Sequence, residues 1–547
     1  MTALATTPDR LLVSGDEAVA LACLDAGVRL GTGYPGTPST EILETFAQLG
    51  GKAQWAPNEK VAMEVALGAA FAGARAIVTM KHVGLNVAAD VLFTAAYTGV
   101  TGGFVIVSAD DPGMASSQNE QDNRHFARAA GVPMLEPADS QQAYELTGMA
   151  FALSERFSIP VILRMTTRVC HSKTIMRRVP LDKPPHDPHF ERDIPARVMV
   201  PAYARPAHVR LRDKLERIAA WNEISGLNPR IEGDRSLGIV TSGVATVHVR
   251  EAAPQATVLQ LTVTYPLPMG LLRDFAASVD RLLVIEEGDP ILEHDLRAAG
   301  IPVEGKPERF RFGELTVDRV RRILTGNQEP EPPPVRGKPP MLCEGCSHRS
   351  VFTVLRKLGC IVAGDIGCYT LAVLPPFEAM DTCVCMGASI GVGLGLRHVL
   401  PPEEAKQVVS VIGDSTFMHS GLTGLAEMVY NPPPTGHVLL ILDNGTTAMT
   451  GAQEHAGTGR NLIHDPTGKV VFEEVARAMG IRHVVVLDPM ADEEGMEAEI
   501  RAALESGELA VIIARRACIL AAGKIRQWEK AAAEKRAAAH PASPEAN

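Results

Sequence analysis

The sequence predicts an α/β protein made of several doubly wound domains, each a parallel β-sheet with helices on both faces. Short apolar runs alternate with longer helical patterns along most of the 547 residues. Alternation of strands and helices produces a buried parallel sheet. The length allows three or four domains. A composition of 46% apolar and 21% charged residues is ordinary for a globular protein.

The first domain is expected over residues 1–180. A segment beginning at Leu30 opens into a Pro/Gly turn and leads to a helix. Strands are predicted at 76–79, 103–108, 134–137 and 159–165, and helices at 37–49, 61–72, 84–96 and 141–154.

Residues 181–236 are predicted to form a connecting arm, because they are rich in Pro, Arg, Asp and His and lack strand periodicity. A single helix is expected there, near 211–223. A smaller α/β unit should follow over 237–327, with strands at 237–241, 256–261 and 281–287. The Pro-rich stretch 328–340 is predicted to be a semi-rigid linker, since consecutive prolines favour an extended chain.

The last α/β domain is expected over residues 341–524. Its predicted strands lie at 408–412, 438–443, 483–486 and 510–514. Residues 525–547 are rich in Ala, Lys and Glu, which favours a flexible tail that begins as a helix and frays.

The charge and the chain ends limit the classes of function. A net charge of -11 and a pI of 5.9 give no support for a nucleic-acid partner. The N-terminal residues lack a signal-peptide pattern, and no apolar run reaches the roughly 20 residues that a bilayer requires. We expect a cytoplasmic enzyme without a membrane partner. Nine scattered cysteines favour thiols or metal ligands over disulfides.

Two apolar runs, 408–412 and 438–443, end in polar residues at the point where open α/β sheets bind ligands. Asp414 follows the first run, and Asn444 follows the second run. The two residues are 30 positions apart. A carboxylate, an amide oxygen and a backbone carbonyl, which Thr446 could supply, suit a diphosphate-bound Mg²⁺. Gly413 and Gly445 would allow phosphates to approach the backbone. A strand-end turn with Asp414 as a helix N-cap is the alternative.

Glu59 is a candidate functional carboxylate in the first domain. It opens a helix rich in small residues, within Trp55-Ala-Pro-Asn-Glu-Lys. On local sequence alone, a first-turn carboxylate that interacts with the helix dipole is an equally good interpretation.

Several longer motifs occur in a characteristic order. They are Gly33-Tyr-Pro-Gly-Thr-Pro-Ser-Thr40, Asn58-Glu-Lys, Thr79-Met-Lys-His-Val-Gly-Leu-Asn86, Ala109-Asp-Asp-Pro-Gly-Met, Ser116-Ser-Gln-Asn-Glu-Gln-Asp, Gly364-Asp-Ile-Gly-Cys-Tyr-Thr370 and Cys385-Met-Gly-Ala-Ser-Ile390. Together they resemble the alpha subunits of indolepyruvate ferredoxin oxidoreductases, which are thiamine-diphosphate-dependent 2-oxoacid:acceptor oxidoreductases. The resemblance extends to about residue 524.

This resemblance implies a thiamine-diphosphate-binding fold. The pyrimidine-binding domain would be 1–180, a transketolase-C-like domain 237–327 and the diphosphate-binding domain 341–524. Glu59 would activate the cofactor, Thr37 would reach the substrate carboxylate, and His82 and Asn86 would line the same cavity, with His419 a weaker candidate. The implied cofactor-binding residues are Gly387, Gly413, Asp414, Ser415, Asn444, Gly445 and Thr446. Ser415 departs from the glycine that many relatives have there.

Four cysteines match the places of a [4Fe-4S] site in related 2-oxoacid ferredoxin oxidoreductases. They are Cys343, Cys346, Cys368 and Cys518. Four thiolates suit such a cube, whereas zinc modules usually have two close C-x-x-C pairs. Zinc and free thiols remain the alternatives. Cys383 and Cys385 are predicted to be buried strand residues.

The expected activity is oxidative decarboxylation of aryl-pyruvates, such as indolepyruvate, to acyl-CoA and CO₂. The resemblance implies a homodimer of this chain with a small second (beta) subunit, and CoA and an electron acceptor as further partners. No ferredoxin-type cysteine run follows Cys518, which leaves the electron exit open. Alternatives are a non-oxidative thiamine-dependent decarboxylase or carboligase, and a non-catalytic scaffold.

Overall fold

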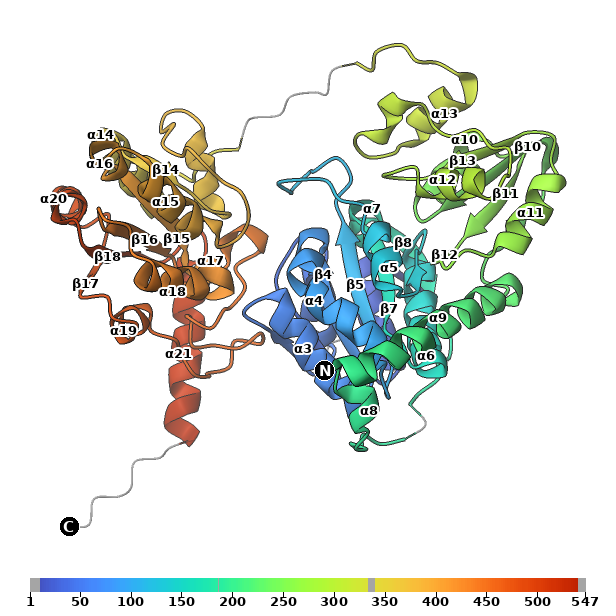
Figure 1. Cartoon of the computed structure of the whole chain (residues 1–547), viewed down its shortest axis with the longest axis horizontal. Coiled ribbons are helices and arrows are strands. Elements are labelled where there is room, and N and C mark those ends of the chain that lie inside the picture. The colour runs from blue at the N-terminus through green and yellow to red at the C-terminus, as the bar shows by residue number, and fades with distance from the viewer. Residues whose placement is uncertain (1–9, 185, 333–339, 540–547) are drawn as a thin grey trace. The chain divides into compact units, whose positions relative to one another are not determined.

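The structure is a computed structural model that describes residues 10–184, 186–332 and 340–539. It divides into two compact units, 1–332 and 333–547 (Figure 1). Most of the predicted linker 328–340 lies outside the described residues, as do residues 540–547 of the predicted flexible tail.

The first unit is built on a seven-stranded sheet with the order β12-β6-β7-β5-β4-β2-β3. The strands are β2 (Leu30–Gly33), β3 (Ala53–Trp55), β4 (Ala76–Lys81), β5 (Phe104–Asp110), β6 (Met134–Leu135), β7 (Val161–Thr166) and β12 (Val263–Tyr265). All neighbouring pairs are parallel except β12 with β6. β5 and β7 are buried at every position, as expected for strands covered on both faces.

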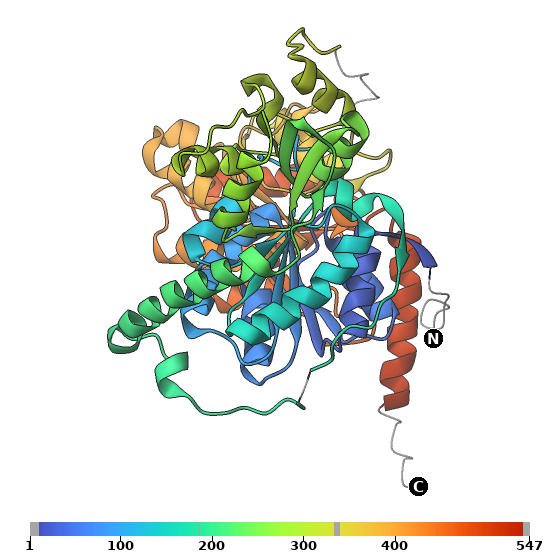
Figure 2. The ribbon, with the colours of Figure 1, turned by 90° about the vertical axis from the view of Figure 1, so that its right-hand side faces the viewer.

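Helices surround this sheet (Figure 2). They are α1 (Gly15–Asp25), α2 (Thr40–Gln48), α3 (Glu59–Phe71), α4 (His82–Thr98), α5 (Arg124–Ala130), α6 (Ser140–Phe157), α7 (Thr167–His171), α8 (Ile194–Arg197) and α9 (Pro201–Ile224). A separate antiparallel pair, β1 (Arg10–Ser14) with β8 (Lys173–Arg177), joins the two ends of the first domain.

A second sheet of this unit has the order β13-β10-β11-β9. Its strands are β9 (Arg230–Ile231), β10 (Asp234–Ser242), β11 (Ala256–Leu261) and β13 (Leu282–Ile285), and its helices are α10 (Ala245–Ala252), α11 (Met269–Ala277), α12 (Ile291–Ala298), η2 (Glu308–Arg311) and α13 (Val317–Thr325). β12 leaves this region of the sequence and pairs with β6, so the larger sheet is completed by a distant segment.

The second unit contains a five-stranded, fully parallel sheet with the order β14-β15-β16-β18-β17. The strands are β14 (Ile361–Ala363), β15 (Val408–Gly413), β16 (His437–Asp443), β17 (His483–Leu487) and β18 (Leu509–Arg515). Its helices are α14 (Ser347–Lys357), η3 (Cys368–Val373), α15 (Ala388–Val399), α16 (Pro402–Ala405), α17 (Asp414–Thr416), η4 (Phe417–Gly421), α18 (Leu422–Tyr430), η5 (Ala448–Thr450), α19 (Phe472–Ala478), α20 (Glu493–Ser506) and α21 (Ala522–Ala539).

The predicted α/β class with several parallel-sheet domains is confirmed, and two local predictions are wrong. Cys383 and Cys385 are exposed and lie outside any strand, because the chain makes one bridge at Thr382 and then turns into α15. The connecting arm contains two helices, α8 and α9, where one was predicted, and α9 begins ten residues before 211. Pro201 occupies its first turn, where the missing N–H is harmless, and the helix accommodates Pro206 near its start. Among the described residues, no helix combines the length and apolarity that crossing a membrane requires.

Candidate active site

The carboxyl ends of β15 and β16 bring Asp414 and Asn444 to the same edge of the second unit's sheet, because the two strands are parallel neighbours. Asp414 is buried, and its Oδ1 and Oδ2 each accept a 2.8 Å hydrogen bond, from the backbone N–H groups of Ser415 and Gly445. The Asp414–Gly445 contact joins the two predicted halves of the site directly.

Asp414 is held in its ionised form. Burial alone would raise the pKa of this carboxyl, but His455, whose Nε2 lies 3.2 Å from Oδ2, and the two backbone donors lower it below its usual value. A carboxylate that stays charged in a buried position is what a divalent cation requires. His455 was not predicted, since an isolated histidine eleven residues beyond Asn444 carries no signal in the sequence.

Asn444 and Thr446 complete the predicted oxygen set. The Asn444 side-chain oxygen accepts a hydrogen bond from the Thr446 N–H at 3.1 Å, and both residues are buried. The Thr446 hydroxyl donates to the carbonyl of Gln453, so its side chain is engaged within the loop. The ligand oxygens fit Mg²⁺: the end of β15 offers the Asp414 carboxylate, and the loop after β16 offers the Asn444 amide oxygen and the Thr446 backbone carbonyl.

Tyr369 is a second residue that the sequence did not indicate. Its hydroxyl accepts a 2.9 Å hydrogen bond from the N–H of Gly413 and donates to the carbonyl of Ile366. A Cβ at Gly413 would lie 2.8 Å from the Tyr369 ring, so only glycine fits there. Tyr369 thereby ties the Gly364–Thr370 motif to the start of the Asp414 turn.

Asp365 of the same motif organises the predicted Gly387 segment. Its two carboxylate oxygens accept hydrogen bonds from the N–H groups of Gly387, at 2.9 Å, and Ser389, at 3.0 Å. Both donors belong to the beginning of α15. Ser415 directly follows Asp414, and its hydroxyl lies 2.8 Å from that of Thr447 in the loop after β16. His419 is buried in the π-helical turn η4, with Nδ1 2.7 Å from the Ser420 hydroxyl.

The four predicted cysteines come together from three separate segments. Cys343 and Cys346 precede α14, Cys368 begins η3, and Cys518 follows β18. All four line one cavity of about 250 Å³, together with Asn444 and His348. We refer to this space as the cysteine cavity.

The thiols in the cysteine cavity affect one another. Burial, followed by the nearby Cys518, Cys346 and Cys343, raises the pKa of Cys368 to about 11. Thiolates gathered in this way need a cation to neutralise them.

The spacing of the four sulfurs bears on which cation they could hold. Among the described residues, no three of these sulfurs all lie within 4.8 Å of one another. A single zinc ion with Zn–S bonds of about 2.3 Å would need them closer.

In the first unit, three candidates lie at the carboxyl ends of neighbouring strands: Thr37 after β2, Glu59 after β3 and His82 after β4. Glu59 is buried at the start of α3, which the Asn58 side chain caps by accepting from the Val61 N–H. A Cβ at Gly84 would lie 2.6 Å from the Glu59 carboxylate, so α4 packs directly on it.

His82 and Asn86 occupy different environments on α4. His82 is fully buried, with Nε2 3.1 Å from the carbonyl of Asn119, and burial lowers its pKa. Asn86, one turn further on, is exposed. Thr37 is partly exposed in the turn before α2. The structure therefore gathers Thr37, Glu59 and His82 at one edge, with Asn86 at the surface of this unit.

Comparison with family models defines the class of protein. Residues 21–216 match the model "Pyruvate flavodoxin/ferredoxin oxidoreductase, thiamine diP-bdg", and residues 365–514 match "Thiamine pyrophosphate enzyme, C-terminal TPP binding domain". The chain is thus a thiamine-diphosphate-binding protein of the 2-oxoacid oxidoreductase class.

Curated relatives identify the family. The chain is 39% identical to indolepyruvate oxidoreductase subunit IorA of Methanothermobacter thermautotrophicus, over 95% of this chain and 88% of the relative. It is 38% identical to IorA of Pyrococcus horikoshii, over 94% and 86%. The chain belongs to the IorA family. The fold is similar to that of 2-oxoglutarate:ferredoxin oxidoreductase from Magnetococcus marinus, with a TM-score of 0.50, 18% identity and coverage of 58% and 65% of the two chains.

Proposed function

We propose that this chain is the large subunit of an enzyme that oxidatively decarboxylates aryl-pyruvates, of the indolepyruvate type, to acyl-CoA and CO₂. The observation that supports it best is the cysteine cavity, where four thiols meet beside Asn444. A thiamine-dependent enzyme that does not transfer electrons has no need of such a set. The names of the relatives support the aryl substrate.

Asp414, Asn444 and Thr446 would hold Mg²⁺, and Gly387, Gly413, Ser415 and Gly445 would surround the diphosphate. Thiamine diphosphate supplies the carbanion chemistry that cleaves a 2-oxoacid. Glu59, held buried against Gly84, would share a proton with the aminopyrimidine ring. Thr37 would donate a hydrogen bond to the substrate carboxylate, while His82 and Asn86 contribute to the substrate pocket.

Cys343, Cys346, Cys368 and Cys518 would hold one [4Fe-4S] cluster. Four thiolates from three segments and the spread of the sulfurs fit a cube better than a single ion. The partners would be a small second subunit, CoA and an electron acceptor, and this chain would form a homodimer within that complex.

The test is anaerobic co-purification with the small subunit, followed by analysis of iron, sulfide, thiamine and turnover of a panel of 2-oxoacids. We expect four iron atoms per chain, absorption near roughly 400 nm, and the fastest acceptor reduction with aryl-pyruvates. Fastest turnover of pyruvate or 2-oxoglutarate would refute the substrate class. Release of an aldehyde without acceptor reduction, from protein lacking iron, would instead establish a non-oxidative decarboxylase.

A further inference from the structure

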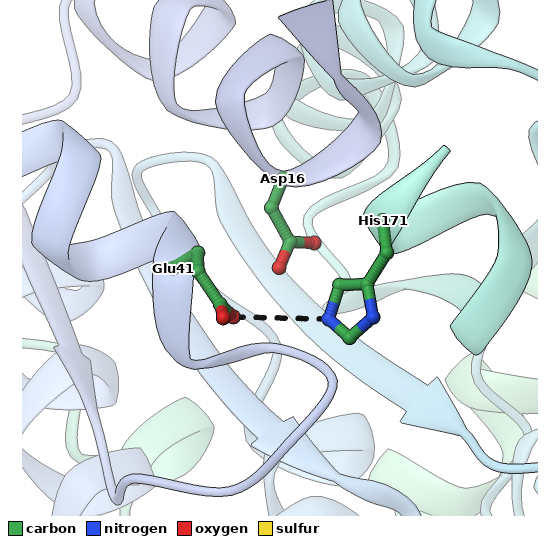
Figure 3. Close-up of side chains that lie close together, drawn as sticks. All are labelled: Asp16, Glu41 and His171. Atoms are coloured by element: carbon green, nitrogen blue, oxygen red, sulfur yellow. Dashed lines mark ion pairs between the residues drawn. The ribbon is translucent and has the colours of Figure 1, made fainter. Parts of the chain in front are cut away.

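A group of three potential metal ligands lies in the first unit, separate from the residues proposed above. It consists of Asp16 at the start of α1, Glu41 in the first turn of α2 and His171 at the end of α7 (Figure 3). One ligand atom from each residue lies within 4.8 Å of the other two. His171 Nε2 and Glu41 Oε2 are 3.9 Å apart.

Asp16 distinguishes this group from an ordinary cluster of surface charges. Its side chain is fully buried, and neither carboxylate oxygen accepts a hydrogen bond from an N–H group or a hydroxyl of the described residues. Its close neighbours are Glu41, which adds negative charge, and the buried thiol of Cys170, a weak donor. A buried carboxylate without compensation is costly, and cations are the usual partners of such groups.

We propose that Asp16, Glu41 and His171 form a binding site for a divalent transition-metal cation of the Zn²⁺ type. An imidazole and two carboxylates are ligands that such ions accept, with bonds of about 2.0–2.2 Å. Ligand atoms on one ion are then at most about 4.4 Å apart, so a small rotation of the half-exposed Glu41 and His171 side chains closes the site around Asp16.

The ion would cross-link three segments that are distant in the sequence. α1, α2 and α7 each contribute one ligand, and α2 directly follows the turn that carries Thr37. The site would therefore stabilise the carboxyl edge of the seven-stranded sheet. This inference does not depend on the substrate or on the cluster assigned under the proposed function.

The test is calorimetric titration of the full chain with Zn²⁺, together with thermal unfolding with and without the ion. Asp16→Asn and His171→Gln should each bind one equivalent fewer than the wild type and lose the Zn²⁺-dependent rise in Tm. Zn²⁺ bound at the cysteines contributes equally to every variant, since none of these substitutions touches a cysteine.

His125→Gln is the matched control, because His125 is also an exposed histidine beside a carboxylate, 2.9 Å from Asp289, but outside the group. His125→Gln should bind as many equivalents of Zn²⁺ as the wild type. Without metal, Asp16→Asn should raise Tm, because it removes the buried uncompensated carboxylate. If Asp16→Asn does not fold, the proposal is tested by His171→Gln alone, since His171 is exposed. Equal Zn²⁺ binding by wild type and His171→Gln would overturn the proposal.

Discussion

The backbone N–H of Cys518 donates a 2.9 Å hydrogen bond to the carbonyl oxygen of Asn444. This hydrogen bond therefore connects Cys518, the last of the four clustered cysteines, to Asn444 of the proposed magnesium site. Tyr369 makes an equivalent connection, since it follows Cys368 directly and accepts from Gly413. Two short links thus join the cysteine cavity to the loops that carry Asp414 and Asn444, which would suit electron transfer from thiamine diphosphate to the proposed cluster.

The first prediction concerns Glu59. Glu59→Gln should leave the fold and cofactor binding intact and lower kcat by on the order of 10² to 10⁴-fold, because the amide cannot share a proton with the cofactor ring. Steady-state turnover and thiamine diphosphate titration measure the two effects. Glu64→Gln, on the exposed side of the same helix, is the control and should retain activity. Full turnover by Glu59→Gln would remove Glu59 from its role.

The second prediction concerns the cluster. Cys368→Ser should lose iron while circular dichroism shows an unchanged fold, because Cys368 lines the cysteine cavity and does not belong to the apolar core of this unit. Cys360→Ser is the matched control: Cys360 belongs to the same unit but lies outside the cavity lining. Unchanged iron in Cys368→Ser, or equal loss in both variants, would contradict the cluster assignment.

The third prediction tests the contact between Gly413 and Tyr369. Gly413→Ala should destabilise the second unit by about 1–3 kcal/mol and weaken thiamine diphosphate binding, because the new Cβ would meet the Tyr369 ring at 2.8 Å. Gly391→Ala, inside α15, adds a Cβ into open space and should be neutral or stabilising. Thermal unfolding and cofactor titration of both variants check this, and a wild-type Tm for Gly413→Ala would refute it.

The fourth prediction concerns pH. His437 is fully buried against Ser410, and burial, with the charge of Arg397, lowers its pKa to about 3. Below the unfolded-state pKa of about 6.5, the unfolded chain binds a proton that the folded chain cannot. The free energy of unfolding should therefore fall by about 1.4 kcal/mol per pH unit from this group as pH drops from 6 to 4. When the free energy of unfolding is measured by urea at several pH values, it should fall less steeply with decreasing pH in His437→Gln than in the wild type. An equal pH dependence in the two proteins would contradict the prediction.

Strand and helix periodicity allowed most of the elements to be predicted from sequence. β11 and the buried strands of both large sheets coincide with the predicted apolar runs, because strands covered on both faces must be apolar throughout. The short strands β1 and β8 escaped prediction, since they have exposed positions and are defined by pairing across more than 150 residues. β12 was also missed, because its pairing with β6 depends on a distant segment.

The motifs and their order determined the family, the cofactor and the residues to inspect, because the chemistry of a site requires particular side chains at particular places in the chain. Only the tertiary structure decided which of them meet. It brought four scattered cysteines to one cavity, placed Tyr369 and His455 against the Asp414 turn, and buried Asp16 beside Glu41 and His171. The physical reason is that burial and hydrogen bonding depend on contacts between segments far apart in sequence, which local patterns do not encode.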